Sequence, residues 1–264
     1  MISSLHNEKV KALMALMNKP RERKERGLFI CEGPKVYLEA VKAGLVDSVY
    51  VSDSFRGRND DIAPEAEVMS DDVFEKVSGT VTPQGVLTVT KMPEYTLEGL
   101  LSGKYKGDRP KDTLNLIILE DVRDPGNIGT IIRTAEGAGM DAVIMSQGCV
   151  DVFNPKVVRS TMGTIFRMPF IYVKDFQGTL DELQKAGTRL YAAYLPGSED
   201  YRAVSNEDYA KKGAIIGNEA NGLTRETAEK ADVRVRIPMD GKVESLNAAV
   251  AASLLMYEIR RSRA

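Results

Sequence analysis

Three short segments of this sequence place polar side chains where a strand runs into a loop or a helix. They are residues 127–133, 215–219 and 237–247. Glycine and asparagine at the carboxyl end of a strand let backbone groups point at a ligand, and Glu219 at such an edge indicates a functional carboxylate. The segments lie far apart in the chain, yet each has the form of one part of a shared site.

Each segment also has a purely structural interpretation. Asn127 is placed to cap the helix that contains Arg133, and an arginine among apolar neighbours requires an anionic partner if it is buried. Glu219 fits a turn that caps the next helix. Ser245 is a natural N-cap for the helix that follows it. Taken singly, the three segments leave these alternatives open.

The residue types exclude several other kinds of chemistry. The only histidine is His6, near the N-terminus, which argues against histidine triads, a histidine general base and histidine-bound metals. Cys31 and Cys149 are isolated from each other in the sequence. We therefore expect no disulfide framework, no metal site and a reduced, cytoplasmic setting.

Length and charge limit the classes to which the protein can belong. The 264 residues suggest one large domain or two ordinary ones, and 43% apolar residues are enough for a real core. The 36 Lys plus Arg against 38 Asp plus Glu give no overall basic character, so any nucleic-acid footprint must be local. Neither a signal peptide nor an apolar run of the roughly 20 residues that span a membrane is apparent.

Regular alternation of strand and helix begins after a polar stretch at residues 102–113, which we interpret as a linker. Apolar runs beyond it predict strands at 114–119, 142–145, 170–173, 189–194, 214–216 and 233–237. Helices are expected between them, and a long closing helix at 245–259. This order predicts an α/β domain over 114–264 with a mostly parallel sheet, preceded by a smaller α/β domain over 1–101.

The common nucleotide-binding and hydrolase signatures are absent from the larger domain. No Gly-x-Gly-x-x-Gly follows the first strand, and there is no phosphate-binding loop ending in Gly-Lys-Ser/Thr. A Gly-x-Ser-x-Gly elbow is also missing. A standard Rossmann dehydrogenase, a P-loop NTPase and an α/β-hydrolase are therefore disfavoured.

Three motifs of the sequence resemble, in order and spacing, those of the SpoU/TrmH family of RNA 2′-O-methyltransferases, within the SPOUT superfamily. They are Asn-x-Gly-x-x-x-Arg, Gly-Asn-Glu, and Ile-Pro followed by Glu-Ser-Leu-Asn. Residues 154–163 are similar to the family's region between its first two motifs, and the N-terminal domain looks like its L30e-like substrate-binding domain. The resemblance implies a C-terminal trefoil knot, S-adenosylmethionine as methyl donor, RNA as substrate and a homodimer with the closing helix at its interface.

The resemblance also implies roles for individual residues. Backbone around Ala193, Gly217, Ile237 and Leu246 is expected to hold the adenosine portion of the donor. The expected catalytic surroundings are Asn127, Arg133, Glu219, Ser245 and Asn247. Because a guanidinium is very hard to deprotonate, Arg133 is expected to stabilise the forming alkoxide and not to act as a base.

RNA contacts are expected at two places. Arg159 is a candidate phosphate contact, and the basic stretch 19–26 is a candidate RNA-binding arm with Arg21, Arg23 and Arg26. A solvated charged loop is the alternative for that stretch. Ribosomal RNA is the expected substrate, because the N-terminal domain resembles those of ribosomal enzymes.

Three other functions remain as alternatives at this point. One is 2′-O-methylation of transfer RNA. Another is a non-catalytic RNA-binding protein, against which the intact catalytic motif positions argue. The last is a small-molecule α/β enzyme that uses another nucleotide, against which the missing phosphate loops argue.

Overall fold

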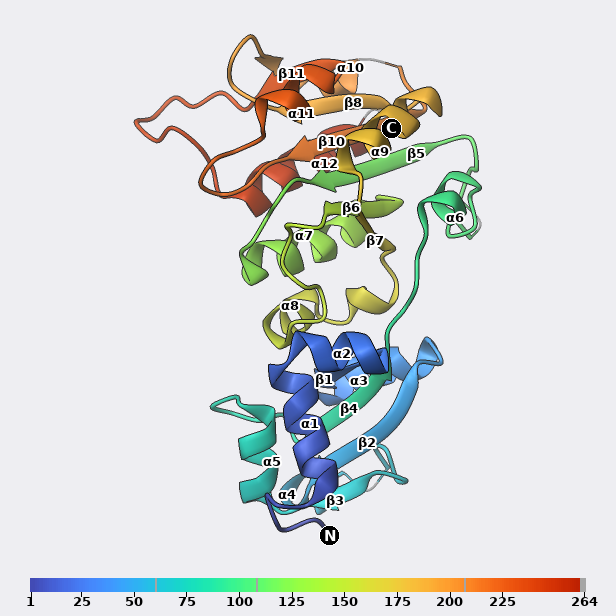
Figure 1. Ribbon diagram of the computed structural model, residues 1–264, viewed down its shortest axis with the longest axis vertical. Helices are drawn as coiled ribbons and strands as arrows, with labels where there is room; N and C mark the ends of the chain where they lie inside the picture. Colours follow the sequence, from blue (N-terminus) through green and yellow to red (C-terminus); the bar gives the residue numbers. More distant parts are fainter. Residues whose placement is uncertain (60, 108, 207, 262–264) are drawn as a thin grey trace. The chain divides into compact units, whose positions relative to one another are not determined.

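The computed structural model of the protein describes residues 1–59, 61–107, 109–206 and 208–261. Residue 108 of the expected linker therefore lies outside the described residues. The chain forms two compact units, drawn as a ribbon in Figure 1. The first unit consists of Met1–Glu94 and Asp151–Arg167, and the second of Tyr95–Val150 and Met168–Ala264.

The first unit is built on a four-stranded sheet with the order β1-β4-β2-β3. Strand β4 is antiparallel to β1 and β2, and β3 is parallel to β2. The strands are β1 (Leu28–Glu32), β2 (Val46–Ser52), β3 (Glu67–Met69) and β4 (Val86–Lys91). The helices are α1 (Glu8–Asn18), α2 (Pro20–Arg26), α3 (Pro34–Lys42), α4 (Asp53–Arg56), α5 (Asp71–Ser78), α8 (Pro155–Thr161) and the 3-10 turn η1 (Thr164–Phe166).

Apolar side chains of α1 and α5 pack on this sheet to form a core. By their spacing, Val10, Leu13, Met14 and Met17 are expected on one face of α1. Val10 and Leu13 are buried, whereas Met14 is exposed and Leu16 is buried instead.

The second unit is a seven-stranded sheet with the order β7-β6-β5-β10-β8-β11-β9, and every pairing in it is parallel. The α/β fold with a mostly parallel sheet is therefore confirmed. The strands are β5 (Leu114–Leu119), β6 (Ala142–Ser146), β7 (Phe170–Val173), β8 (Arg189–Ala193), β9 (Glu199–Asp200), β10 (Lys211–Ile216) and β11 (Val233–Arg236).

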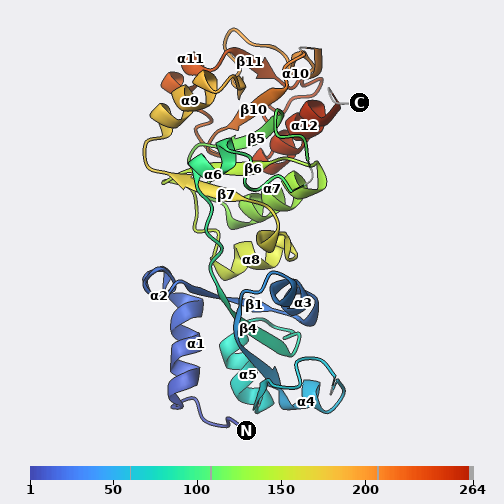
Figure 2. The same cartoon turned by 90° about the vertical axis from the view of Figure 1, so that its right-hand side faces the viewer.

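Helices cover both faces of this sheet, as Figure 2 shows. Helix α9 contacts α11 on one face, and α7 contacts α12 on the other. The helices of this unit are α6 (Leu97–Leu101), α7 (Pro125–Gly137), α9 (Phe176–Lys185), α10 (Ala203–Asn206), α11 (Arg225–Lys230) and α12 (Ala248–Arg261). Among the described helices, none is long and apolar enough to cross a bilayer.

The boundaries of the units differ from the expected linker in two ways. Lys106 and Arg109 join the second unit, because their cationic groups lie 3.2 and 3.0 Å from Oδ1 of the buried Asp141. The segment 151–167 joins the first unit, where Asp151 is paired with the buried guanidinium of Arg23 at 2.6 Å. Buried charges require such partners, and local sequence patterns do not reveal them.

Candidate active site

A pocket of about 350 Å³ lies at the carboxyl ends of β8, β10 and β11. Ligands of parallel α/β sheets bind at this edge. Its walls come from residues 193–195, 216–222, 235–237, 239 and the region between 244 and 255. The four positions expected to hold the donor, Ala193, Gly217, Ile237 and Leu246, all line this pocket.

The wall after β10 is a tight turn made largely of backbone. Asn218 and Gly222 exchange two backbone hydrogen bonds, at 3.1 and 2.8 Å. A Cβ at Gly217 would lie 2.1 Å from the carbonyl carbon of Gly222. Only glycine fits at position 217, and its backbone can therefore approach a ligand closely.

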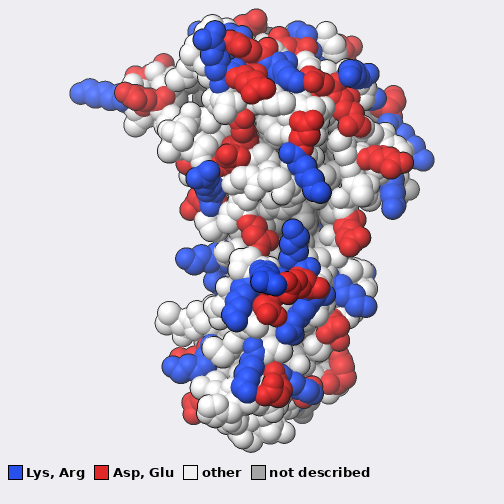
Figure 3. All heavy atoms as spheres, in the orientation of Figure 1, with Lys and Arg blue, Asp and Glu red and all other residues white. Residues whose placement is uncertain are grey.

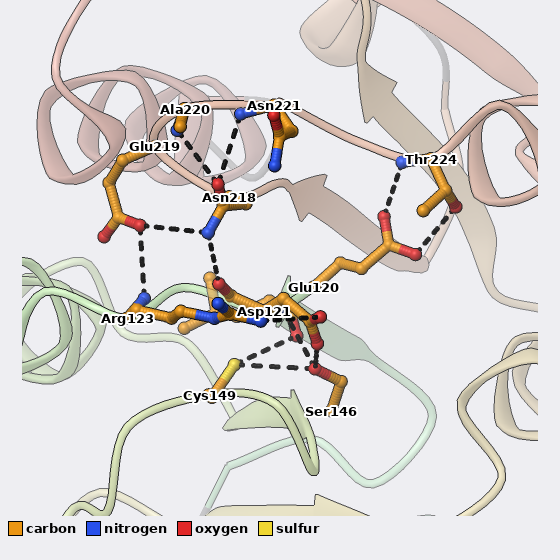
Figure 4. A network of polar contacts seen from close by, with 11 residues as sticks. Glu120, Asp121, Arg123, Ser146, Cys149, Asn218, Glu219, Ala220, Asn221 and Thr224 are labelled. Atoms are coloured by element: carbon orange, nitrogen blue, oxygen red, sulfur yellow. Dashed lines mark hydrogen bonds and ion pairs between the residues drawn. The ribbon is translucent and has the colours of Figure 1, made fainter.

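Glu219 connects this turn to the loop that follows β5 through hydrogen bonds. Its Oε1 accepts hydrogen bonds from the Asp124 backbone N–H at 3.0 Å and from Asn127 Nδ2 at 2.9 Å. Its Oε2 accepts from the Arg123 backbone N–H at 3.1 Å, a bond that Figure 4 shows.

These hydrogen bonds determine the ionisation of the carboxylate. Burial is the largest single influence on the pKa of Glu219 and raises it, but the hydrogen bonds from Asn127, Asp124 and Arg123 together lower the pKa below its ordinary value. Glu219 is thus ionised at neutral pH, and its oxygens are occupied. It is suited to holding the site together and poorly suited to taking a proton.

Asn127 and Asn247 extend the network to the third segment. Asn247 Nδ2 donates to Asn127 Oδ1 at 2.9 Å, and Asn127 in turn donates to Glu219. One residue from each of the three segments therefore takes part in a single hydrogen-bonded chain. Asn127 and Asn247 lie outside the pocket lining, whereas Glu219 and Ser245 belong to it.

Two expected helix caps are wrong. Helix α7 is capped by Asp124, whose Oδ1 accepts from the Asn127 backbone N–H at 2.8 Å, because Pro125 begins the helix earlier than expected. Helix α12 is capped by Asn247, whose Oδ1 accepts from the backbone N–H groups of residues 249 and 250. Ser245 is therefore free of the capping role and is exposed at the pocket.

Arg133 lies on the exposed surface of α7, away from the pocket lining. It follows Asn127 by six residues, which corresponds to about 9 Å along the helix axis and about 120° around it. Within residues 109–206 and the other described ranges, no carboxylate pairs with it. The interpretation of a buried arginine–carboxylate pair is wrong, and one chain does not bring Arg133 to its own pocket.

The expected RNA arm forms helix α2, and its three arginines differ in how exposed they are. Arg23 is wrong as an RNA contact, because only 2% of its surface is exposed and it donates to Asp151 and to the Leu16 carbonyl. Arg21 and Arg26 are exposed, with ion pairs to Glu25 at 2.6 Å and to Glu22 at 3.1 Å.

Surface charge is mixed in both units. On the face drawn in Figure 3, basic and acidic side chains are interspersed, in agreement with the balanced composition. Arg159 lies half-buried in the last turn of α8. The described parts of the chain contain no group of three or more His, Cys, Asp or Glu side chains arranged to hold a metal ion.

Sequence reasoning missed Glu120, which fixes the far end of the pocket turn. Its carboxylate accepts from the backbone N–H and the hydroxyl of Thr224, both at 2.8 Å, and from the Thr227 hydroxyl at 2.6 Å. Figure 4 shows the two bonds to Thr224. An acidic residue directly after a largely apolar strand was the signal that could have identified it.

Comparisons with known proteins agree with this geometry. Residues 115–257 match the SpoU rRNA Methylase family, and residues 7–88 match the MRM3-like substrate binding domain. The chain is 35% identical to the 23S rRNA (guanosine(2553)-2′-O)-methyltransferase RlmP of Bacillus subtilis, over 98% of each chain.

Solved structures show the same architecture. An AdoMet-bound rRNA methyltransferase from Sinorhizobium meliloti is 30% identical, with a TM-score of 0.83 over 98% of this chain and 97% of that one. The SpoU methyltransferase AviRb from Streptomyces viridochromogenes, in complex with AdoMet, is 28% identical, with a TM-score of 0.81 over 98% of each chain. The chain therefore belongs to the SpoU rRNA methylase family, and it is an RNA 2′-O-methyltransferase that uses S-adenosylmethionine.

Proposed function

We propose that this protein methylates the 2′-hydroxyl of one ribose in ribosomal RNA of the large subunit. The observation that carries the assignment is the hydrogen-bonded chain from Asn247 through Asn127 to Glu219, which joins the three segments beside one pocket. The name of the Bacillus subtilis relative, which covers nearly the whole chain, supports 23S rRNA as the substrate.

The pocket suits S-adenosylmethionine in size and in lining. Its volume of about 350 Å³ falls in the range of roughly 300–1,000 Å³ that is typical of small-molecule sites. Ile216, Leu246 and Leu255 offer apolar surface for a purine ring, and the backbone of 217–222 offers polar groups for its edges. Two carboxylates, Glu219 and Glu244, line the pocket and favour a cationic ligand.

The bound donor would supply a methyl group already activated on a sulfonium. The protein's task is then to align the 2′-hydroxyl and to stabilise the alkoxide that forms as its proton passes to an RNA phosphate or to solvent. Alignment of reacting groups contributes as much as ~7–11 kcal/mol in favourable cases. Ser245, exposed at the pocket, orients the ribose. Asn127 and Asn247 act as positioning residues, because their amides hold Glu219 and the start of α12. An arginine stabilises the alkoxide.

That arginine is Arg133 of a second copy of the chain. Within one chain, Arg133 is exposed on α7 and outside the pocket lining, which favours its use at the site of a second copy. Helix α12, which packs against α7, exposes Val250 and Tyr257 at 48% and 51%. These positions are seven residues apart and share one helix face. An exposed apolar pair on α12 and an exposed arginine on the neighbouring α7 support a twofold dimer in which each subunit completes the other's site.

Recognition of RNA belongs to the first unit, much of which matches a substrate-binding domain. Arg21 and Arg26 on α2 remain candidate phosphate contacts, and Lys24 lies exposed on the same helix. Arg159 on α8, in the same unit, remains a further candidate. A few local cations are sufficient for phosphate contacts even when the net charge is near zero.

A trefoil knot and a cytoplasmic location complete the proposal. The return of the chain from β11 past the pocket turn to α12, which packs on α7 and β10, supports the knot. Stretching single molecules from both ends tests it, because a knotted chain stops short of its full contour length.

The free thiols of Cys31 and Cys149 fit a reducing compartment, and cell fractionation tests that location.

The experiment that tests the proposed function combines donor binding with methyl transfer. Titration calorimetry should show one S-adenosylmethionine site per chain, and labelled methyl should appear in ribosomal RNA at ribose 2′-oxygens. Gly217→Ala is the matched control, because its Cβ enters the pocket turn and should abolish both signals. Label in transfer RNA alone, or wild-type activity in the control, would overturn the assignment.

A further inference from the structure

The turn after β5 contains a backbone conformation that is unusual for its residue type. Asp121 has a φ of +54°, in the left-handed region. Ala63 and Met162 are the other non-glycine residues with positive φ in the part of the chain that the structure describes. Such conformations cost free energy and persist where surrounding contacts enforce them, often at functional sites.

Ser146, the last residue of β6, enforces the conformation of Asp121. Its hydroxyl oxygen accepts from the Asp121 backbone N–H at 2.9 Å, and its O–H donates to Asp121 Oδ1 at 2.6 Å. Gly148 leaves room for this carboxylate, since a Cβ there would lie 2.1 Å from Asp121 Oδ1. Figure 4 shows Ser146 directly against Asp121.

Asp121 in turn positions two residues that line the donor pocket. Its carbonyl oxygen accepts from Asn218 Nδ2 at 2.8 Å. Two and three residues further on, the backbone N–H groups of Arg123 and Asp124 donate to the Glu219 carboxylate. The direction of these N–H groups depends on how the chain turns at Asp121. A continuous set of contacts therefore leads from Ser146 to the pocket wall.

We propose that the Asp121–Ser146 pair is a latch that holds the donor pocket in its binding conformation. Asp121 is accordingly a positioning residue for methyl transfer, although it lies outside the pocket lining. Without its carboxylate, the turn 121–124 loses its fixed direction, and Asn218 and Glu219 are no longer held in place. The expected consequence is weaker donor binding, with a smaller effect on the chemical step.

Two substitutions at Asp121 separate the side chain from the backbone. Asp121→Gly adopts positive φ without strain but lacks the acceptor for Ser146. Asp121→Asn tolerates the same backbone and retains a side-chain oxygen that accepts from Ser146. We expect the glycine variant to raise the KM for S-adenosylmethionine about tenfold with little change in kcat, the signature of lost ground-state binding. The asparagine variant should remain close to wild type.

Ser146→Ala provides an independent route to the same test. It removes both hydrogen bonds to Asp121 and should raise the donor KM by about tenfold or more. Adding Asp121→Gly to it should have little further effect, because the side-chain bond that the glycine removes is already lost. Ala63→Gly is the matched control, since it relaxes a positive φ in the first unit and should leave the donor KM unchanged. Thermal melting should stay near that of wild type in every variant.

The outcomes are decisive for the latch. A wild-type donor KM in Asp121→Gly or Ser146→Ala, or fully additive effects in the double variant, would overturn it. A rise in KM that merely follows a fall in melting temperature would do the same. The inference rests on the proposed function, and the two fail differently: a wild-type protein that neither binds the donor nor methylates RNA refutes the function, whereas an active wild type with unaffected variants refutes the latch alone.

Discussion

Arg133 is the residue on which the chemical step depends most in this account. It is exposed and lies outside the donor pocket of its own chain. Arg133→Ala should lower kcat about 100-fold or more, the usual effect of removing a group that stabilises developing charge. Donor affinity should stay within about twofold of wild type, because the pocket lining is intact. Single-turnover kinetics measures the loss in kcat, and calorimetry measures the donor affinity. Near-normal turnover would show that Arg133 does not stabilise the alkoxide.

Glu219 should make stability depend on pH. Its folded-state pKa lies below the ordinary value of 4.5, so its ionised form stabilises the fold above that value, and the contribution disappears as pH falls through the folded-state pKa. Glu219→Gln should therefore be less stable than wild type at pH 7. The difference should shrink steadily as the pH is lowered below about 4.5.

Urea unfolding of both proteins across this pH range provides the measurement. Glu226→Gln is a suitable control, because Glu226 is an exposed residue on α11 outside the pocket lining. A stability difference that is constant from pH 7 to pH 3.5 would show that the Glu219 hydrogen bonds do not favour the charged form.

At the residue scale, the sequence identified the pocket positions but not how they are held. Gly217 and Ser245 were recognisable because their motifs are local strings of residues. The caps at Asp124 and Asn247 differ from expectation by only three and two positions, which is within the uncertainty of helix ends predicted from sequence. The burial of Arg23 was unpredictable, because its partner Asp151 lies 128 residues away.

At the element scale, the long apolar strands were predictable and the short polar elements were not. Strands β5 and β7 have the bounds expected from the sequence. Helix α5 and strand β3 were not foreseen, since one is short and rich in charge and the other has three residues. The meeting of three segments at one sheet edge followed from the parallel order of the strands, which brings their carboxyl ends together.

Helix α2 should respond to substitution according to which side chain is removed. Arg23→Ala leaves the Asp151 carboxylate without its cation and two backbone carbonyls without a donor, and should destabilise the first unit by about 3 kcal/mol. Arg21→Ala, on the exposed side, should change stability by less than about 0.5 kcal/mol. Urea unfolding compares them, and equal effects would contradict the buried ion pair.

Substitutions on the exposed side of the same helix should instead affect RNA binding. Combined substitution of Arg21, Lys24 and Arg26 by alanine should weaken RNA binding and reduce its dependence on salt, because fewer counterions are displaced from phosphates. Binding to an RNA fragment at several salt concentrations provides the measurement. An unchanged salt slope would place the RNA contacts elsewhere in the first unit.

At the scale of the whole molecule, the division into units could not be predicted from local patterns. The segment 151–167 interrupts the second unit and folds with the first, through Arg23–Asp151 and the contact between Phe29 and Phe153. Hydrophobic periodicity does not reveal this return of the chain, because contacts between residues more than a hundred positions apart determine it. The homodimer was likewise an implication of resemblance and not of the sequence pattern.

A mixed dimer tests whether subunits complete each other's sites. Co-expressed Arg133→Ala and Gly217→Ala chains, each inactive alone, should recover about a quarter of wild-type activity, because random pairing gives about half mixed dimers with one intact site each. Differently tagged chains allow the mixed dimer to be purified. Its complete inactivity would show that Arg133 and the pocket of one site come from the same chain.

The pocket beside Glu219 is proposed to serve the transfer of a methyl group to a ribose of ribosomal RNA. The most direct measurement is a map of 2′-O-methylated nucleotides in ribosomal RNA from cells with the gene, without it, and complemented with wild-type or Gly217→Ala protein. We expect one nucleotide whose methylation is lost without the gene and restored only by the wild-type protein. An unchanged map, or restoration by Gly217→Ala, would contradict the proposal.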